Sequence, residues 1–574
     1  MKLFRYLKPF RLSISAALVL VMIRALADLY LPTLSADMVN VGIVNGDIQY
    51  IWHVGIRMMV FAAAGTSAFI FSGYLSSRAA AGFARLLREQ VFSRVESFSL
   101  YEFNRFGTAS LINRTTNDIT HLQNVLIFGM RMMVMAPMLS IGSLFLAFSK
   151  EPVLARAFLA VIPVLFAIIS ITIRKGVPLF QAMQVKLDDL NRIVRERLTG
   201  IRVIRAFNRD DYEKQRFQDT NSDYTATAVR VNRIMGAMMP LMTLVMNLTI
   251  VGIVWFAGIR IDLGFTNVGN LMAFIQYAMH IMFSFVAISR IFVVIPRATA
   301  SAARINEILD TAVEIRDPEK AKKTEGKGGS VEFREVTFSY PGAERPALSN
   351  ISFIARPGKV TGIIGSTGSG KSTLAGLILR FYDVDSGSIL VDGVDVREMT
   401  QESLRSKIGF VPQNAVLFSG SVLENIRFGR EDADEKDIMR AAETAQAAGF
   451  ILDMKEGFSS MIAQGGRNLS GGQKQRISIA RAIIRKAGIY ILDDCFSALD
   501  YRTEARLRSA LFKETGDSTV IIISQRVSTV KEADQIIVLE EGKIAGIGTH
   551  EELLDDCAIY REIVSSQFSE EGIA

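Results

Sequence analysis

A glycine-rich loop at Gly365–Ser372 carries the clearest chemistry in this sequence. It follows an apolar run at Lys359–Ile364 that reads as a strand, and it opens a helix pattern that begins at Lys371. Glycines let backbone N–H groups turn inward around phosphates, and a helix N-terminus adds a favourable partial charge. Lys371 is then placed to reach the β- and γ-phosphates, and Ser372 to bind Mg²⁺. The sequence therefore predicts a site for ATP and Mg²⁺.

Three further side chains have the chemistry to complete such a site. Asp493 ends the apolar run Ile489–Leu492 and can hold the metal ion through water. The amide of Gln413 can reach the metal or an attacking water. Tyr340 lies upstream of the loop, where its ring could stack on adenine, although a core aromatic is the alternative interpretation.

Two motifs extend this reading to a known family. Leu469–Gln473 is a second glycine motif, followed by a basic and apolar helix pattern, and Ser497–Asp500 follows Asp493 closely. Their order and spacing resemble the nucleotide-binding domain of ATP-binding cassette (ABC) transporters. The resemblance implies that two such domains pair head to tail, with each ATP between the phosphate loop of one and the Leu469–Gln473 signature of the other.

The expected ATP-binding set combines the loop, the aromatic and the signature. It comprises Tyr340, Gly365, Ser366, Thr367, Gly368, Ser369, Gly370, Lys371, Ser372, Thr373, Ser470, Gly471, Gly472 and Gln473. The resemblance implies that the last four contact the nucleotide of the partner chain. Metal binding is assigned to Ser372, Gln413 and Asp493.

The catalytic positions depart from the family pattern. Asp494 stands where hydrolytic members of the family have glutamate, and Gln525 stands where they have histidine. Gln464, five residues before Leu469, stands where the corresponding loop of exporters usually has glutamate. A positioned general base contributes about 10²–10⁴ in rate, but the aspartate carboxylate falls roughly 1–1.5 Å short. An amide can donate a hydrogen bond but carries no positive charge. We therefore expect a slow or non-hydrolytic site, and a second, different half-transporter that supplies the catalytic glutamate.

The first half of the chain must position this domain at a membrane. Of the 574 residues 49% are hydrophobic, and the mean hydropathy is +0.27. Buried core helices could explain one long apolar run but not six, so the runs are interpreted as membrane spans. They lie at 13–35, 53–77, 126–148, 152–173, 234–259 and 268–295.

The distribution of basic residues gives an orientation. Lysine and arginine gather at the N-terminus and in the long segments after the second and fourth runs. By the positive-inside rule these parts, and the C-terminal half, are cytoplasmic. The net charge of +7 then reflects orientation in a bacterial cytoplasmic membrane and not binding of nucleic acid. The first apolar run is too long for a signal peptide and contains Arg24 and Asp28, so it reads as an uncleaved span.

These patterns define the expected domains. Residues 1–310 form an all-α six-span membrane domain, 311–330 a charged, glycine-rich linker, and 331–574 an α/β domain with a largely parallel sheet. Residues 1–12 read as an amphipathic lead-in. The segments 78–125 and 174–233 are expected to continue the spans as helices, with turns near Tyr101–Gly107 and Phe207–Tyr212.

The cargo is less determined by the sequence. Methionines in the spans suit a cavity for lipophilic or drug-like compounds, but simple gap filling explains them equally well. They are Met130, Met132, Met133, Met135, Met235, Met238, Met239, Met242, Met246, Met272, Met279 and Met282.

Charged residues within the spans are equally open to two readings. Arg24 and Asp28 can pair, whereas Arg57, Arg131 and His280 are candidates for a polar cavity.

Two alternatives to a heterodimeric exporter remain. One is a homodimeric, slowly hydrolysing lipid or drug flippase, and the other is a nucleotide-gated channel or regulatory membrane protein. The two cysteines, Cys495 and Cys557, imply neither a disulfide framework nor a metal site, and Cys495 is expected to be an inert buried thiol.

Overall fold

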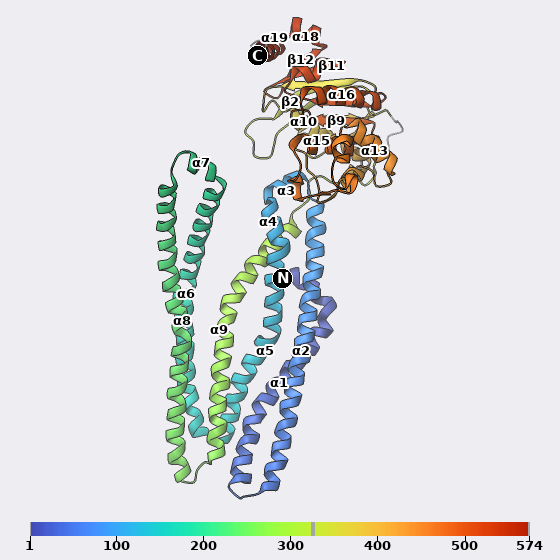
Figure 1. Ribbon diagram of the computed structural model, residues 1–574. Coiled ribbons are helices and arrows are strands. Elements are labelled where there is room, and N and C mark those ends of the chain that lie inside the picture. The colour runs from blue at the N-terminus through green and yellow to red at the C-terminus, as the bar shows by residue number, and fades with distance from the viewer. Residues whose placement is uncertain (1, 323–327, 572–574) are drawn as a thin grey trace. The chain divides into compact units, whose positions relative to one another are not determined.

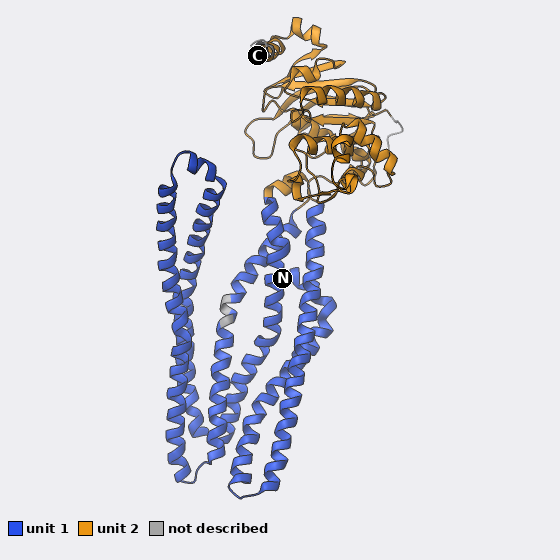
Figure 2. Cartoon of the chain, in the orientation of Figure 1, with its two compact units in different colours: residues 1–96, 106–311 blue, residues 97–105, 312–574 orange. Residues whose placement is uncertain are grey.

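The computed structural model describes residues 2–322 and 328–571. The chain packs as two compact units (Figure 2), residues 1–96 with 106–311 and residues 97–105 with 312–574. The short segment 97–105 thus packs with the second unit, although the sequence pattern assigned it to the membrane domain. Of the predicted linker 311–330, residues 323–327 lie outside the described residues.

The first unit is entirely helical, and six of its described helical segments are long and apolar enough to cross a membrane. Several exceed the roughly 20 residues that a span needs, since α2 has 49 residues and α8 has 53. The predicted continuation of the spans as helices is therefore confirmed. The elements are η1 (Lys2–Phe10), α1 (Arg11–Asp37), η2 (Met38–Ile43), α2 (Ile48–Glu96), α4 (Thr108–Asn113), η3 (Arg114–Asp118), α5 (Ile119–Lys150), α6 (Pro152–Thr199), α7 (Ile201–Ala206), α8 (Asp210–Asp262) and α9 (Val268–Asp310).

The long helices pack in pairs. α1 lies along α2, α5 along α9, and α6 along α8 (Figure 1). The predicted turns at the two tips contain short helices, α3 (Leu100–Phe106) and α7. The Glu102 carboxylate closes the first turn of α3, because it accepts hydrogen bonds from the Ser99 backbone N–H at 2.7 Å and hydroxyl at 2.5 Å.

The second unit contains two main sheets. A six-stranded sheet has the order β12-β11-β3-β10-β9-β6, and a four-stranded sheet has the order β2-β1-β4-β5. The strands are β1 (Val331–Phe338), β2 (Leu348–Ala355), β3 (Val360–Gly365), β4 (Ser386–Val391), β5 (Val394–Asp395), β6 (Ile408–Val411), β7 (Gly420–Ser421), β8 (Met461–Ile462), β9 (Ile489–Asp493), β10 (Thr519–Ile523), β11 (Gln535–Glu540) and β12 (Lys543–Gly548).

The prediction of one largely parallel sheet holds for the larger sheet only. β6, β9, β10, β3 and β11 pair in parallel, and β12 is an antiparallel edge strand. The apolar runs at β1 and β4 were assigned to the same sheet, but these strands pair antiparallel with each other in the smaller one. Hydrophobic periodicity identifies a strand but does not name its neighbours, which explains this error.

The larger sheet is buried on both faces. Along β10, Val520 and Ile522 belong to one hydrophobic core, whereas Ile521 and Ile523 belong to the other. This explains why the strand reads as an unbroken apolar run. The described helices of the unit, besides α3, are α10 (Lys371–Ile378), η4 (Val396–Glu398), α11 (Gln401–Ser406), α12 (Val422–Arg427), α13 (Glu435–Thr444), α14 (Ala448–Leu452), η5 (Gly457–Ser459), η6 (Gln464–Gly466), α15 (Gly471–Ile483), α16 (Tyr501–Glu514), α17 (Val527–Val530), α18 (His550–Asp556) and α19 (Ala558–Glu571).

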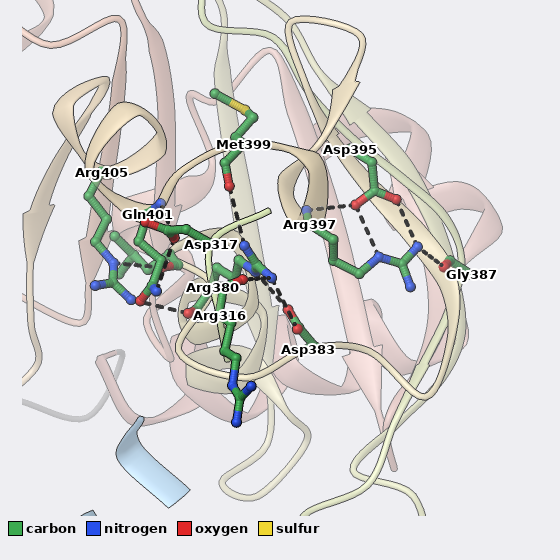
Figure 3. Close-up of polar contacts among 11 residues, drawn as sticks. Arg316, Asp317, Arg380, Asp383, Gly387, Asp395, Arg397, Met399, Gln401 and Arg405 are labelled. Carbon is green, nitrogen blue, oxygen red and sulfur yellow. Dashed lines mark hydrogen bonds and ion pairs between the residues drawn. The ribbon is translucent and has the colours of Figure 1, made fainter. Parts of the chain in front are cut away.

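Polar contacts hold Arg316 and Asp317, near the start of the second unit, to the rest of that unit (Figure 3). Arg380 is buried and donates to the Arg316 carbonyl at 3.2 Å while it pairs with Asp383 at 2.9 Å. The Asp317 carboxylate accepts the Gln401 backbone N–H at 2.9 Å. These contacts hold Arg316 and Asp317 against the second unit.

Candidate nucleotide site

Parallel strands bring the predicted site residues to one sheet edge. Ile523 lies opposite Ile363 on β3 and opposite Asp493 on β9, so the carboxyl ends of the three strands meet. A pocket of about 440 Å³ opens there. Its lining includes Tyr340, Thr367, Gly368, Gly370, Lys371, Ser372, Thr373, Gln413, Asp493, Asp494 and Gln525.

Two glycines of the phosphate loop have backbone conformations that other residues rarely adopt. Gly368 has φ +85° and Gly370 has φ +98°, both in the left-handed region. A Cβ atom at Gly370 would also lie 2.9 Å from the Ala347 carbonyl oxygen and 2.6 Å from a Leu348 methyl carbon. The loop can therefore turn into α10 only with glycine at this position.

Lys371 lies within the loop that it closes. Its ammonium donates to the carbonyl oxygens of Gly365 at 2.9 Å and Ser366 at 2.6 Å. Burial lowers the pKa of Lys371, and the nearby carboxylates of Asp494 and Asp493 oppose that effect. The side chain is thus a cation already withdrawn from water, which strengthens its attraction for phosphate oxygens.

Ser372 and Asp493 form the metal side of the pocket. The serine hydroxyl donates to the Asp493 carboxylate at 3.1 Å, and burial raises the pKa of Asp493. A hydroxyl and a carboxylate at this separation are hard oxygen donors of the kind that Mg²⁺ accepts beside substrate phosphates. The residues present therefore fit the ion. Among the described residues no cluster of three or more histidine, cysteine or acidic side chains forms another metal site.

Asp494 is held in a constrained conformation at the mouth of the pocket. Its φ of +45° is left-handed, and its backbone N–H donates to the Ile523 carbonyl at 2.8 Å. The Gln413 amide donates to its carboxylate at 3.3 Å. Burial raises the pKa of Asp494, while Gln413, Arg526 and Lys371 lower it.

Gln525 lies in the same pocket lining as Asp494. Its backbone carbonyl accepts a hydrogen bond from the Gln567 amide at 2.7 Å, which ties the loop after β10 to α19. The structure thus brings Asp494, Gln525 and Gln413 together beside the phosphate loop.

Tyr340 belongs to the pocket and not to the core. It is 38% exposed, and its hydroxyl is hydrogen-bonded to Thr373 at 3.0 Å. Phe338 and Tyr382 pack edge-on against the ring, with centroids at 5.0 and 5.4 Å. Tyr382 was not predicted, since no motif surrounds it and only the fold brings it next to Tyr340.

The signature is built at a different place in the domain. Ser470 caps α15, where its hydroxyl accepts the Gln473 backbone N–H while the Gln473 side chain accepts the Ser470 N–H. Gly472 lies so close to the Ala498 carbonyl that a Cβ would approach it to 3.1 Å. Neither these residues nor Gly471 line the pocket, so one chain does not unite its own signature and phosphate loop. Gly365, Ser366 and Ser369 form the base of the loop, outside the pocket lining.

Cys495, next to Asp494, is fully buried, and burial raises the pKa of its thiol well above the ordinary value. The expected burial of this thiol is confirmed, and its inertness, which a raised pKa favours, stays a prediction.

Comparison with known proteins gives matches to both units. The family model described as ABC transporter transmembrane region matches residues 14–285, and the one described as ABC transporter matches residues 348–497. An uncharacterized ABC transporter ATP-binding protein of Mycobacterium tuberculosis is 41% identical over 567 residues, covering 98% of this chain and 97% of that protein. The ATP-dependent lipid A-core flippase of Vibrio parahaemolyticus is 30% identical, covering 99% and 98%. A solved bacterial Atm1-family ABC exporter with ATP bound is 26% identical with a TM-score of 0.80, covering 97% and 98%.

Proposed function

The chain belongs to the ABC transporter family and has the fold of an ABC exporter, and from that premise we propose that it is one half of a heterodimeric exporter. In this proposal its own ATP site is weakly hydrolytic or non-hydrolytic, and its signature completes the competent site of a different half-transporter.

The observation that carries the proposal is the composition of one pocket. Residues assigned to nucleotide and metal, among them Tyr340, Lys371 and Asp493, line this pocket together with Asp494 and Gln525. Asp494 is bonded to Gln413, and its shorter side chain places the carboxylate farther from the attacking water than a glutamate would. Gln525 offers the γ-phosphate a neutral amide.

The signature supports the other half of the proposal. Ser470, Gly471 and Gly472 are intact and lie outside the pocket of their own chain. With the helix N-terminus behind them they offer donors to phosphate oxygens of a second chain's nucleotide. That partner carries the catalytic glutamate and histidine.

We further propose that the complex moves lipophilic or drug-like compounds out of the cytoplasm or inner leaflet. The chain would be a multi-pass protein of a bacterial cytoplasmic membrane, with both termini in the cytoplasm, membrane lipid around it and no nucleic-acid partner. Binding of ATP closes the two cytoplasmic domains, and the helical extensions transmit this closure to the spans. A slow homodimeric flippase is the second candidate, because one relative is a lipid A-core flippase.

The test is ATP turnover by the purified chain alone and by its complex with a second half-transporter that has the consensus glutamate. We expect turnover of the complex to exceed that of the chain alone by about 10² or more, the lower end of what a positioned base contributes. A stable lone chain that hydrolyses ATP as fast as the complex would contradict the heterodimer and favour the flippase.

A further inference from the structure

A group of charged side chains lies within the apolar spans of the first unit. On α1, Arg24 pairs with Asp28 at 2.8 Å, which confirms the pairing expected from their spacing. Arg24 also donates to the Thr66 hydroxyl on α2 at 3.3 Å. His280 lies on α9, a helix that packs against α1. The nucleotide site uses none of these groups.

A second guanidinium, that of Arg131 on α5, approaches the same region. It lies over the Phe69 ring of α2 at 5.0 Å from the centroid, and the Arg24 guanidinium is 6.0 Å from that centroid. A Cβ at Gly73 would collide with the Arg131 guanidinium. Glycine at this position therefore lets the arginine lie directly on α2. The two arginines share one aromatic ring, a favourable contact for each cation.

The charges in this group do not balance. Asp28 compensates Arg24, but Arg131 has no carboxylate partner among the residues whose side chains the structure describes, and its Nε is buried without a hydrogen-bond acceptor. The buried hydroxyls of Ser72 and Ser76, on the same part of α2, and the Nδ1 of His280 also lack partners there. An uncompensated cation within a span is costly and is usually tied to function.

Sequence neighbours of Arg131 on α5 line an apolar cavity, although Arg131 itself is not among the lining residues. Gly129, Met130, Met133 and Val134 flank this arginine along α5 and line a cavity of about 560 Å³. That volume lies within the range of sites for drug-sized molecules, roughly 300–1,000 Å³. Since Val134 is one helical turn from Arg131, a ligand with its apolar body in the cavity can hold a charged group near the guanidinium.

We propose that this group of residues selects a lipophilic cargo that carries one negative charge, such as a carboxylate, sulfonate or phosphate ester. The anion pairs with the Arg131 guanidinium at the edge of the cavity, and the apolar body lies in the cavity. The inference rests on the proposed exporter function and names its cargo class. Neutral compounds of equal size leave the arginine uncompensated and bind less well.

The experiment uses two probes with the same apolar body but opposite charge, 1-pyrenebutyrate, which carries a carboxylate, and 1-pyrenebutylamine, which carries an ammonium group. The two-chain complex is placed in lipid nanodiscs, with empty nanodiscs as the control for partitioning. For each probe we measure the concentration that gives half-maximal binding and the concentration that gives half-maximal stimulation of ATP turnover. We expect the complex to prefer the anion at least tenfold.

Variants of Arg131 separate charge recognition from folding. Arg131→Gln is expected to raise the half-saturation of the anion at least tenfold and to leave that of the cation unchanged. Arg131→Lys keeps the charge and should retain most of the anion response. Arg57, which the sequence also offered as a candidate for a polar cavity, is exposed on α2 and does not line this cavity. Arg57→Gln is therefore the matched control, with no change expected for either probe.

Three outcomes overturn the inference: a preference for the cation, an unchanged anion response in Arg131→Gln, or an equal loss for both probes. The last would show that Arg131 only supports the packing of α2 and α5.

Failure of the proposed exporter function would give a different result. ATP-driven export of the cation alone would leave that function standing, whereas ATP turnover without export of either probe or of a neutral lipophile would remove it.

Discussion

At the scale of single residues, we propose that the ATP site keeps the side chains for binding and lacks those for fast hydrolysis. Lys371 and Asp493 are buried and Ser372 is exposed, and all three side chains are held by hydrogen bonds, Lys371 to the phosphate loop and Ser372 to Asp493. Asp494 and Gln525 occupy the wall where hydrolysis would take place. In this proposal, the site differs from a hydrolytic one by the extra methylene group of a glutamate and the ionisable ring of a histidine.

This difference predicts a gain of function. In a complex whose partner carries glutamine in place of its catalytic glutamate, Asp494→Glu with Gln525→His should raise ATP turnover at least tenfold. A positioned base contributes about 10²–10⁴, and the new side chains need not reach ideal geometry. Steady-state phosphate release measures the effect, and adding Lys371→Ala should abolish it. No rise in the double variant would mean that other features of the pocket suppress hydrolysis.

Removal of the Tyr340 ring from the pocket should weaken the binding of ATP. Stacking of a base on an aromatic ring is worth about 1–3 kcal/mol, so Tyr340→Ala should raise the Kd for ATP roughly 5- to 150-fold. Tyr340→Phe keeps the ring and loses only the hydroxyl contact with Thr373, and should bind nearly as the parent does. Fluorescent-nucleotide titration distinguishes the two, and equal affinity of the alanine variant would show that Tyr340 does not stack on adenine.

At the scale of elements, the sequence predicts strands better than it predicts their partners. β3, β9 and β10 were found because strands buried on both faces read as continuous apolar runs. β2 was missed, since its burial alternates and polar residues interrupt the pattern. The place of α3 could not be foreseen, because it depends on contacts across more than 200 residues, such as the Glu102 carboxylate with the Glu314 backbone N–H at 3.0 Å.

The hydrogen bond between the Glu314 backbone N–H and the Glu102 carboxylate predicts that α3 contributes to the free energy of unfolding. Glu102 is 2% exposed; burial opposes its ionisation, yet hydrogen bonds from Ser99 and Glu314 lower its pKa. Glu102→Ala should cost about 1–3 kcal/mol because buried donors lose their acceptor, and Glu102→Gln should cost less. Thermal unfolding of the complex measures both.

The pH dependence of this contribution has a definite sign. A carboxylate with a lowered folded pKa stabilises the protein above its unfolded pKa of about 4.3, and that stabilisation is lost as pH falls through the lower folded value. The difference in Tm between the parent and Glu102→Gln should therefore be equal at about pH 7 and pH 5.5. A difference that disappears already at the lower of these values would contradict an ionised, hydrogen-bonded Glu102.

At the scale of the whole molecule, the chain has an intact signature that does not line its own pocket. We propose that this signature contacts the nucleotide of a second chain and that the chain's own nucleotide site is weakly catalytic. The sequence pointed to this asymmetry through Asp494 and Gln525, since both positions are defined by nearby motifs. It could not point to the contacts of Arg131, because α2 and α5 meet there only in the folded unit.

The most direct test of the account is ATP turnover by the two-chain complex after two separate substitutions. One is Asp494→Asn in this chain, and the other replaces the partner's catalytic glutamate by glutamine. The account predicts that the partner substitution lowers turnover by about 10² or more, whereas Asp494→Asn leaves most of it. If Asp494→Asn alone stops hydrolysis, the aspartate is catalytic and the division of labour between the two chains is wrong.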